Sequence, residues 1–305
     1  MNLGIEVATG AVRGGTSILF AGLGESVAER AGVVYLGTEG SMLAGALAAY
    51  AVAASTGSPW IGAGAGAVAG AMLAGVHAWF TLVRRTNQLA TGLVVLFLGL
   101  GLTSLFGAKF VQAPVVAFEP WNVPLLGRIP VVGEILFRHD PLTYLSFGLV
   151  PVVWWVIHRS RWGVVLRACG ERSGVVETYG HDVRRVQTVA VLVGGLLAGI
   201  GGAQLSIAYT LAWFENMVQG RGFIALAVVM FAAWHPVKIA GGSYLFGAAL
   251  SLAPALQARG YAVNQFALDA LPYVVILVVL VALGRRHAAN QPEGLSAVFE
   301  TGPSR

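Results

Sequence analysis

The sequence predicts an all-α polytopic membrane protein with about nine to ten transmembrane helices. Its 305 residues are 56% hydrophobic and only 11% charged, and the mean hydropathy is +0.74. A soluble domain contains about 25% charged residues, so this composition excludes an ordinary soluble protein. The 41 glycines agree with this fold class, because small residues allow membrane helices to pack closely.

Nine apolar stretches account for the predicted spans, since about 20 apolar residues cross a bilayer. In chain order they cover approximately residues 8–24, 42–54, 60–83, 89–106, 142–158, 186–209, 222–234, 239–256 and 266–283. Arg84 and Arg85 follow the third stretch and indicate the cytoplasmic side. Nine spans place the N-terminus outside, whereas a tenth crossing or a broken helix near Gly37 places it inside.

Two long polar connections separate these stretches. Residues 107–141 contain five prolines and a balanced charge, which predicts an external connection without a helix. Residues 159–187, called the basic segment below, contain six arginines and three acidic residues. A basic connection between two spans is typical of the cytoplasmic side, so the two connections are expected at opposite ends of the molecule.

The middle of the basic segment, residues 172–179, is long enough for about two helical turns. Gly170 and Gly180 are expected to break the chain on either side of it. Such a helix at the inner membrane face would offer a contact for a soluble partner; the alternative is a solvated basic loop. Residues 1–287 are predicted to form a single transmembrane domain, and residues 288–305 a flexible cytoplasmic tail.

The sequence lacks the motifs of common catalytic and metal sites. It contains no GxxxxGK[ST] loop, no HExxH pattern and no paired ligand spacing, so neither an ATPase site nor a metal site is predicted. The single cysteine, Cys169, cannot form an internal disulfide. Basic residues gather at the ends of spans, which is typical of membrane topology rather than of nucleic-acid binding.

Two of the short spans open in a similar way. Residues 36–44 and 219–227 each place a glycine-flanked charge, Glu39 or Arg221, before a short apolar run. Paired interrupted helices in two halves are typical of inverted-repeat transporters and lie at their pathway; chance similarity is the alternative. Charges inside a bilayer usually have a partner, so we hypothesise that Glu39 and Arg221 pair directly. The alternative places each charge at the headgroup level in contact with water.

Other polar and aromatic residues are candidates for a pathway. Asn87 opens the fourth span and could line a polar path, although such residues also cap and join helices. Trp213, Phe214 and Asn216 precede Arg221 in an outer loop. Aromatic and amide groups together suit the stacking and hydrogen bonding of a planar ligand; the alternative is an interfacial aromatic belt.

Several motifs, taken with their order and spacing, resemble a known family. They are Arg167-Ala168-Cys169-Gly170-Glu171 with Gly180, the glycine-rich run 194–203, Gly220-Arg221-Gly222-Phe223 with Trp234-x-Pro236, Gly37-x-Glu39-Gly40, Asn87-Gln88 with Thr91, and Leu271-Pro272-Tyr273. The chain resembles ABC importer permeases of the ribose/branched-chain amino acid class. Over residues 22–286 it is similar to the simple-sugar/nucleoside branch, especially the shorter of its two paired permeases.

The resemblance implies a vitamin-B12-importer-like permease fold with pseudo-inverted halves, in the bacterial cytoplasmic (inner) membrane. It implies three partners: a second homologous permease, an ABC ATPase subunit that grips the basic segment, and an external substrate-binding lipoprotein. ATP and Mg²⁺ would bind the ATPase, with no cofactor in this chain. The implied substrates are nucleosides, with simple sugars next.

By position, the resemblance assigns coupling to the ATPase to five residues and a pathway role to four. The coupling residues are Arg167, Gly170, Glu171, Tyr179 and Gly180, and the pathway residues are Glu39, Asn87, Arg221 and Phe223. The sequence departs from the family pattern at Tyr35, where asparagine is usual, and at Ala232-Ala233, where a glycine is usual. A secondary transporter or channel is the alternative; it needs an ion-coupling acid within a span, for which Glu39 is the one plausible candidate.

Overall fold

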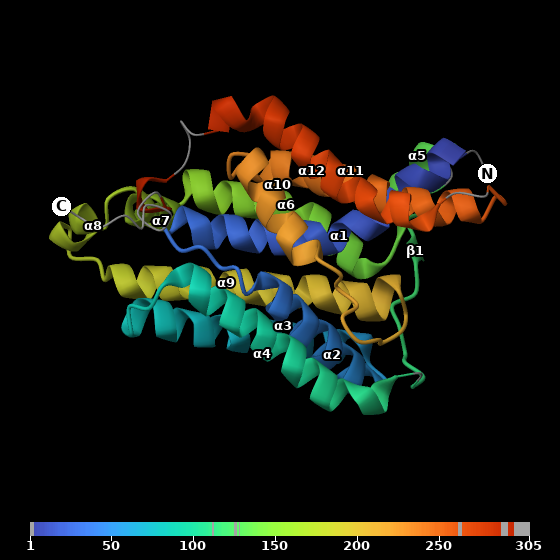
Figure 1. The fold of residues 1–305 in the computed structure, drawn as a ribbon, viewed down its shortest axis with the longest axis horizontal. Coiled ribbons are helices and arrows are strands. Elements are labelled where there is room, and N and C mark those ends of the chain that lie inside the picture. Colours follow the sequence, from blue (N-terminus) through green and yellow to red (C-terminus); the bar gives the residue numbers. More distant parts are fainter. Residues whose placement is uncertain are drawn as a thin grey trace.

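Apolar helices run along one long axis of the molecule in the computed structural model (Figure 1). The structure describes residues 3–111, 113–124, 127, 129–261, 264–287 and 292–295. Its helices are α1 (Leu3–Arg30), α2 (Thr38–Thr56), α3 (Pro59–Ala78), η1 (Trp79–Val83), α4 (Gln88–Gly107), η2 (Ala108–Phe110), α5 (Val132–Leu136), α6 (Pro141–Arg159), α7 (Arg161–Glu171), α8 (Ser173–Thr178), α9 (Val183–Gln204), η4 (Leu205–Tyr209), α10 (Arg221–Phe231), α11 (Pro236–Gln257) and α12 (Gln265–His287). A two-residue ladder joins β1 (Trp121–Asn122) to β2 (Arg138–His139).

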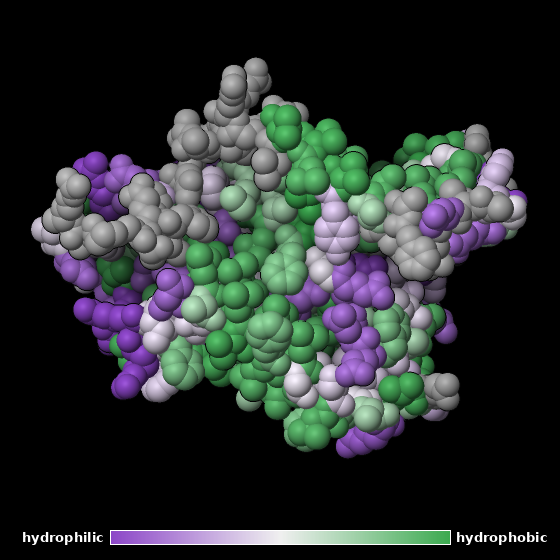
Figure 2. Space-filling model, in the orientation of Figure 1, coloured by the Kyte–Doolittle hydropathy of each residue, from purple (hydrophilic) through white to green (hydrophobic). Residues whose placement is uncertain are grey.

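Five helical segments of the described chain are long and apolar enough to cross a membrane. They are Pro59–Val83, Gln88–Phe110, Pro141–Arg159, Val183–Tyr209 and Pro236–Gln257. Figure 2 shows apolar residues across the middle of one face and hydrophilic residues gathered at the end that carries α7 and α8. These observations confirm the predicted all-α polytopic membrane protein.

The first helix is longer and more polar than the sequence predicts. A span at residues 8–24 followed by a polar stretch was expected, but α1 continues to Arg30. Glu25 and Glu29 therefore lie inside the helix, where both side chains are buried. They are tolerated there because each carboxylate accepts hydrogen bonds from other parts of the chain.

Helix α9 lies at the centre of the molecule and packs against α1, α2 and α3. The helices meet through glycines. A methyl group added to Gly24 of α1 would lie 2.6 Å from the carbonyl oxygen of Gly194, and one added to Gly66 of α3 would lie 2.8 Å from that of Gly45. Small residues thus set the distances between helices, as expected for close packing inside a membrane.

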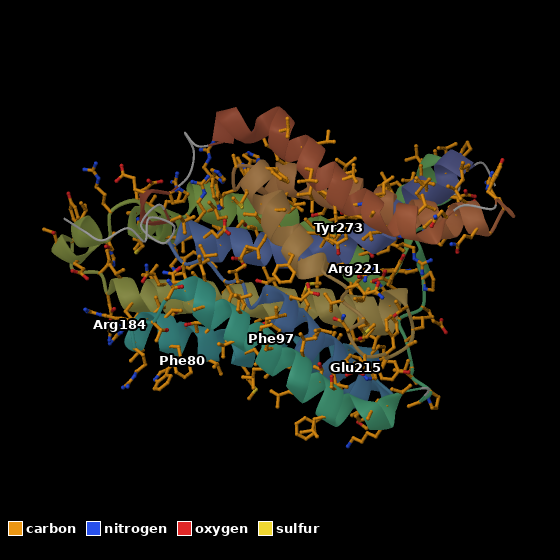
Figure 3. All side chains as sticks on the ribbon, in the orientation of Figure 1. Phe80, Phe97, Arg184, Glu215, Arg221 and Tyr273 are labelled. Atoms are coloured by element: carbon orange, nitrogen blue, oxygen red, sulfur yellow. The ribbon has the colours of Figure 1, made fainter. Side chains whose placement is uncertain are left out.

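The two polar connections lie at opposite ends of the long axis, as predicted (Figure 1). The basic segment forms α7 and α8 at one end, where Figure 3 also shows Arg184 and Phe80. The proline-rich connection 107–141 lies at the other end, close to the start of α1. It was expected to lack a helix, but the five-residue helix α5 forms in it, between Pro130 and Pro141.

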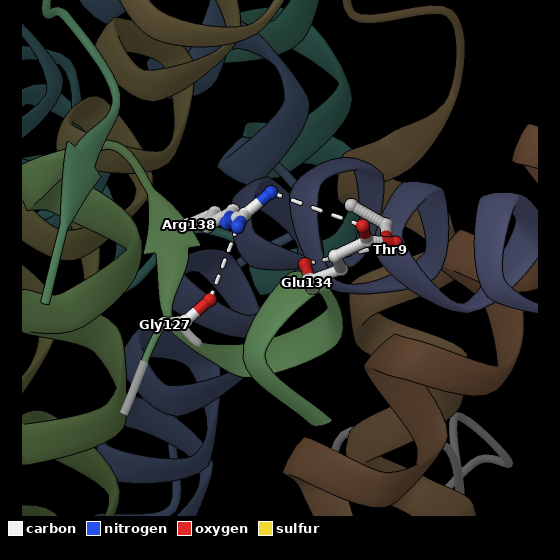
Figure 4. Close-up of polar contacts among 4 residues, drawn as sticks. All are labelled: Thr9, Gly127, Glu134 and Arg138. Carbon is white, nitrogen blue, oxygen red and sulfur yellow. Dashed lines mark hydrogen bonds and ion pairs between the residues drawn. The ribbon is translucent and has the colours of Figure 1, made fainter. Parts of the chain in front are cut away.

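A hydrogen bond attaches the proline-rich connection to α1, and polar contacts of Arg138 stabilise the connection itself. The hydroxyl of Thr9 donates to the carbonyl oxygen of Glu134 at 3.4 Å, and the guanidinium of Arg138 donates to the carbonyl oxygen of Gly127 at 3.1 Å (Figure 4). Arg138 also lies 3.8 Å from the carboxylate of Glu134. This end of the molecule is therefore an ordered cap over the start of α1.

The predicted tail is described only in part. Residues 288–291 and 296–305 lie outside the described residues. In the described part, Leu295 is buried in the core, and a methyl group on Gly294 would lie 2.7 Å from the carbonyl oxygen of Gly170. Residues 292–295 are therefore packed against the basic segment, which the tail's composition did not predict.

Candidate translocation junction and coupling surface

Helices α2 and α10 both begin inside the bundle, and their N-terminal ends meet. Each follows a non-helical segment, residues 31–37 or 210–220, that leads partway along the long axis (Figure 1). A methyl group on Gly222 would lie 2.7 Å from the Cα atom of Glu39, so only glycine allows this contact. The two short helices that open alike in the sequence are thus neighbours in space. We call their meeting point, formed by Glu39 and residues 220–222, the polar junction.

Glu39 binds the backbone at the start of α10. Its Oε1 atom accepts a hydrogen bond from the amide of Gly220 at 2.7 Å, and its Oε2 atom accepts one from the amide of Gly222 at 2.6 Å. The side chain is only 4% exposed. A helix N-terminus presents unpaired N–H groups and a partial positive charge, so the carboxylate is stabilised there without a cationic side chain.

The direct ion pair between Glu39 and Arg221 does not form among the described contacts. The guanidinium of Arg221 donates instead to the carbonyl oxygen of Met217 at 3.2 Å and lies 6.0 Å from the centre of the Tyr209 ring. The Glu39 carboxylate is instead stabilised by the backbone amides of Gly220 and Gly222, and the Arg221 side chain contacts Met217 and Tyr209. The prediction that the two residues share one site is correct in location but wrong in its contact.

The other pathway candidates divide into packed and exposed residues. Phe223 of α10 is 39% exposed. Asn87 lies exposed at the start of α4, where its side chain accepts a hydrogen bond from the amide of Ala90 at 3.0 Å; it therefore caps a helix, and no contact brings it to the polar junction among the described residues. Phe214 and Asn216 are exposed. Trp213 is packed against Gly107 rather than open to a ligand.

A cavity of about 360 Å³ lies beside the polar junction. It is lined by residues of the segment before α10 and of α10, α11 and α12, namely Gln219, Ile224, Ala249, Leu250, Ala253, Leu268, Pro272 and Tyr273. Tyr273 is half exposed, and a methyl group on Gly220 would lie 3.0 Å from its hydroxyl oxygen. Figure 3 shows Tyr273 and Arg221 on the same side of the molecule. The cavity offers an amide and a phenol to a small polar ligand.

The basic segment differs in detail from its prediction. Gly180 ends the second helix as expected, with φ +79°, but Gly170 does not break the chain. Gly170 lies in the last turn of α7. A glycine is needed there because a side chain would collide with the carbonyl oxygen of Arg30 and approach the backbone of Gly32 closely. The first helix of the segment, α7, is thus longer than the second, α8, in which the sequence had placed the predicted helix.

The remaining candidates of the basic segment face outward or bind locally. Tyr179 is 81% exposed. Arg167 donates to the carbonyl oxygen of Gly163 at 3.3 Å, and Glu171 accepts a hydrogen bond from the amide of Glu293 at 3.3 Å. An apolar groove of about 320 Å³ lies between the two helices, lined by Val164, Val165, Ala168, Val175, Val176, Tyr179 and His181.

Cys169 lies on the inner side of α7. It is buried with Val176 and Val183 in a small apolar cluster, and this burial raises the pKa of its thiol. A raised thiol pKa lowers the thiolate fraction, so Cys169 is a packing residue rather than a reactive one.

Sequence reasoning missed the roles of two buried carboxylates of α1, Glu25 and Glu29, which join α1 to the start of α2 and to the end of α10. Glu25 accepts hydrogen bonds from the amide of Tyr35 at 2.9 Å and the hydroxyl of Thr38 at 2.7 Å. Glu29 accepts one from the indole N–H of Trp234. The spacing of four between Glu25 and Glu29 places both on one face of a helix, which is the signal that could have found them.

The amino-acid sequence of this chain is similar to those of known proteins. A family model described as "Branched-chain amino acid transport system / permease component" matches residues 7–283. The chain belongs to this family. This match and the similarity to two nucleoside permeases, NupC and NupQ, identify the chain as an ABC transporter permease of the simple-sugar/nucleoside branch. Such a chain is a multi-pass protein of the cytoplasmic (inner) membrane.

Three relatives cover most of the permease. TsgC13 of Haloferax volcanii, provisionally named a glucose ABC transporter permease protein, is 42% identical over 262 residues, which are 85% of this chain and 78% of the relative. The nucleoside ABC transporter permease protein NupC of Lactococcus lactis is 30% identical over 93% of both chains. The guanosine ABC transporter permease protein NupQ of Bacillus subtilis is 31% identical over 77% of both chains.

Proposed function

We propose that this permease forms one half of the transmembrane pathway of an ATP-driven importer for nucleosides. The observation that carries the proposal is the polar junction, where two helix starts meet inside an apolar bundle. Discontinuous helices of this kind provide polar backbone groups at membrane depth. Two relatives named for nucleoside and guanosine transport support the substrate.

The cavity beside the polar junction supports the same substrate class. Its volume of about 360 Å³ falls in the range of small-molecule sites, about 300–1,000 Å³. The Gln219 amide can donate to and accept from the edge of a base, and the Tyr273 ring can stack on its face. A nucleoside has no net charge, which matches a lining without a charged side chain among the described residues.

Simple sugars are the second candidate. The relative at 42% identity is provisionally named for glucose, and sugar rings also bind through amides and aromatic faces. The two candidates differ in the planar base, which a sugar lacks. Competition between a nucleoside and glucose for the same uptake therefore separates them.

The permease would work with three kinds of partner. An ABC ATPase subunit, which binds ATP and Mg²⁺, would contact the apolar groove between α7 and α8; the exposed Tyr179 lies at its rim. A second, longer permease would complete the pathway. The similarly named glucose ABC transporter permease protein TsgB13 of Haloferax volcanii is 26% identical to this chain over 238 residues, which supports a second, homologous permease as a partner. An external lipoprotein would deliver the substrate.

The proposed topology places the basic segment in the cytoplasm and the proline-rich connection outside. Helices α2 and α10 would each count as one broken span. Together with α1, α12 and the five long apolar segments they would give nine crossings, the lower of the two predicted numbers, in a vitamin-B12-importer-like fold with pseudo-inverted halves. The meeting of two helix starts from different halves supports this arrangement. In this topology the N-terminus lies outside, at the end opposite to the basic segment.

The proposal is tested by tagging this permease and purifying it from its native membrane. We expect an ATPase, a second permease and a lipoprotein to co-purify, and the reconstituted complex to import radiolabelled nucleosides only with ATP. Unlabelled nucleoside should inhibit this uptake and glucose should not. Uptake by the permease alone under an ion gradient, without ATP, would contradict the proposal, and glucose uptake would select the second candidate.

A further inference from the structure

A turn of unusual backbone conformation lies at each end of helix α10. Gln219 and Gly220 before it have φ angles of 51° and 82°, and Ala233 and Trp234 after it have φ angles of 50° and 57°. Residues other than glycine rarely adopt this left-handed region, because the side chain then lies too close to the following carbonyl oxygen. Gln219, Ala233 and Trp234 are held in this unfavourable conformation, so other parts of the chain have to stabilise the two turns.

The turn after α10 is supported by the end of α1. The indole N–H of Trp234 donates a hydrogen bond to Oε2 of Glu29, and both side chains are less than 5% exposed. The Arg30 guanidinium donates to the carbonyl oxygen of Ala233 at 3.3 Å and lies 5.7 Å from the centre of the Trp234 ring. The two ends of α10 are thus held by carboxylates of two different helices, Glu39 of α2 and Glu29 of α1.

The same end of α1 also contacts the basic segment. A methyl group on Gly32 would lie 3.2 Å from the Cα atom of Gly170, which leaves no room between the two backbones. The Gln187 side chain, at the end of the basic segment, donates to the carbonyl oxygen of Ala31 at 3.0 Å. If the basic segment moves, it therefore pushes directly on the backbone of residues 30–32, because no layer of flexible side chains lies between them.

A single side-chain hydrogen bond, between Glu29 and Trp234, joins the carboxylate of α1 to the turn after α10. Among the described residues, Glu29 has no cation within ion-pair distance, and the indole is its one hydrogen-bond donor. A buried carboxylate that loses its donor is strongly destabilised. A partly formed Glu29–Trp234 hydrogen bond is therefore unfavourable. This favours two discrete arrangements of the turn after α10, one with the hydrogen bond and one without it.

We propose that Glu29 and Trp234 are positioning residues that transmit the displacement of the basic segment to α10 and the polar junction. The route runs from Gly170 through residues 30–32 to Trp234, and along α10 to Gly222 and Glu39. The proposal rests on the proposed function, because it requires an ATPase at the basic segment. It adds the residues through which that ATPase would act on the pathway.

The test uses the complete transporter with Cys169→Ser and spin labels at Glu177→Cys and Phe223→Cys. Glu177 is exposed on α8 and does not line the groove proposed to contact the ATPase, and Phe223 is 39% exposed on α10. In the parent protein the distance between the labels should change when ATP and vanadate are added. Trp234→Phe should abolish this change, and Glu29→Gln should retain it, because the amide oxygen still accepts from the indole. Trp155→Phe, at an exposed position of α6, is the matched control and should behave as the parent.

A double substitution distinguishes transmission from a purely structural role. If the hydrogen bond transmits the motion, Glu29→Leu, Trp234→Phe and the double variant should lose the distance change to the same extent, while their complexes still hydrolyse ATP. A distance change equal to the parent's in Trp234→Phe would overturn the proposal. If Trp234→Phe fails to assemble, loss of the change in an assembled Glu29→Gln complex overturns it. No change in the parent would instead contradict the proposed function.

Discussion

Carboxylates form different kinds of interaction at the polar junction and on the basic segment. At the junction and at the far end of α10, Glu39 and Glu29 are buried and accept hydrogen bonds from uncharged N–H groups. On the basic segment, by contrast, Asp182 forms an exposed ion pair with Arg185 at 2.9 Å. A buried carboxylate needs directional donors to offset its lost hydration, whereas an exposed pair contributes little. The comparison indicates a junction held by buried, directional hydrogen bonds and a basic segment whose exposed ion pair contributes little to its conformation.

Removing the carboxylate of the polar junction should have the largest effect. Glu39→Leu leaves the amides of Gly220 and Gly222 without their acceptor, and each unpaired buried group costs about 1–3 kcal/mol. We expect a markedly lower thermal midpoint of the purified protein and loss of uptake, with a smaller loss in Glu39→Gln. Glu177→Leu, an exposed position on α8, is the control. Equal midpoints for Glu39→Leu and this control would show that the junction is not held by Glu39.

Gly222→Ala tests the close approach of the two helix starts. The added methyl group would lie 2.7 Å from both the backbone nitrogen and the Cα atom of Glu39. Because backbone has to move, we expect a cost of about 1–3 kcal/mol in the free energy of unfolding. Gly241→Ala in α11, where nothing lies within 4 Å, should be neutral. The contact would be refuted if both substitutions lowered the thermal midpoint equally.

Ala233→Gly should stabilise the turn after α10. Ala233 has φ 50°, and glycine removes the steric cost of this conformation, about 1–2 kcal/mol. The greater freedom of glycine in the unfolded chain offsets about 0.4–1 kcal/mol. The net expectation is a gain of about 0.5–1 kcal/mol, measured as a higher thermal midpoint. A lower midpoint would mean that the methyl group contributes packing that outweighs its backbone strain.

The smallest effect is expected on the basic segment. Arg172 lies 3.3 Å from the carboxylate of Glu293, and both side chains are more than half exposed. An exposed pair is worth about 0–1 kcal/mol, so Arg172→Gln should change the thermal midpoint of the permease by little. A loss as large as that of Glu39→Leu would remove the distinction between the two regions.

The sequence predicted the fold class, because apolar stretches and basic ends are properties of composition that any membrane helix must satisfy. It also predicted that Glu39 and Arg221 belong to one region, since both open short helices after a glycine. The contact itself was not predictable. The donors to Glu39 are backbone amides, and no side-chain type in the sequence marks an available amide. Glu25 and Glu29 were read as a polar connection because their donors, Tyr35, Thr38 and Trp234, come from residues outside their own helix.

The most direct test of the account asks whether the polar junction faces the pathway. In the reconstituted complex with Cys169→Ser, Phe223→Cys should react with a membrane-impermeant thiol reagent at rates that change when ATP is added. A transported nucleoside should slow the reaction, and Val94→Cys, at an exposed apolar position of α4, should show neither effect. If Phe223→Cys reacts at one rate with and without ATP and nucleoside, the junction does not lie on the pathway.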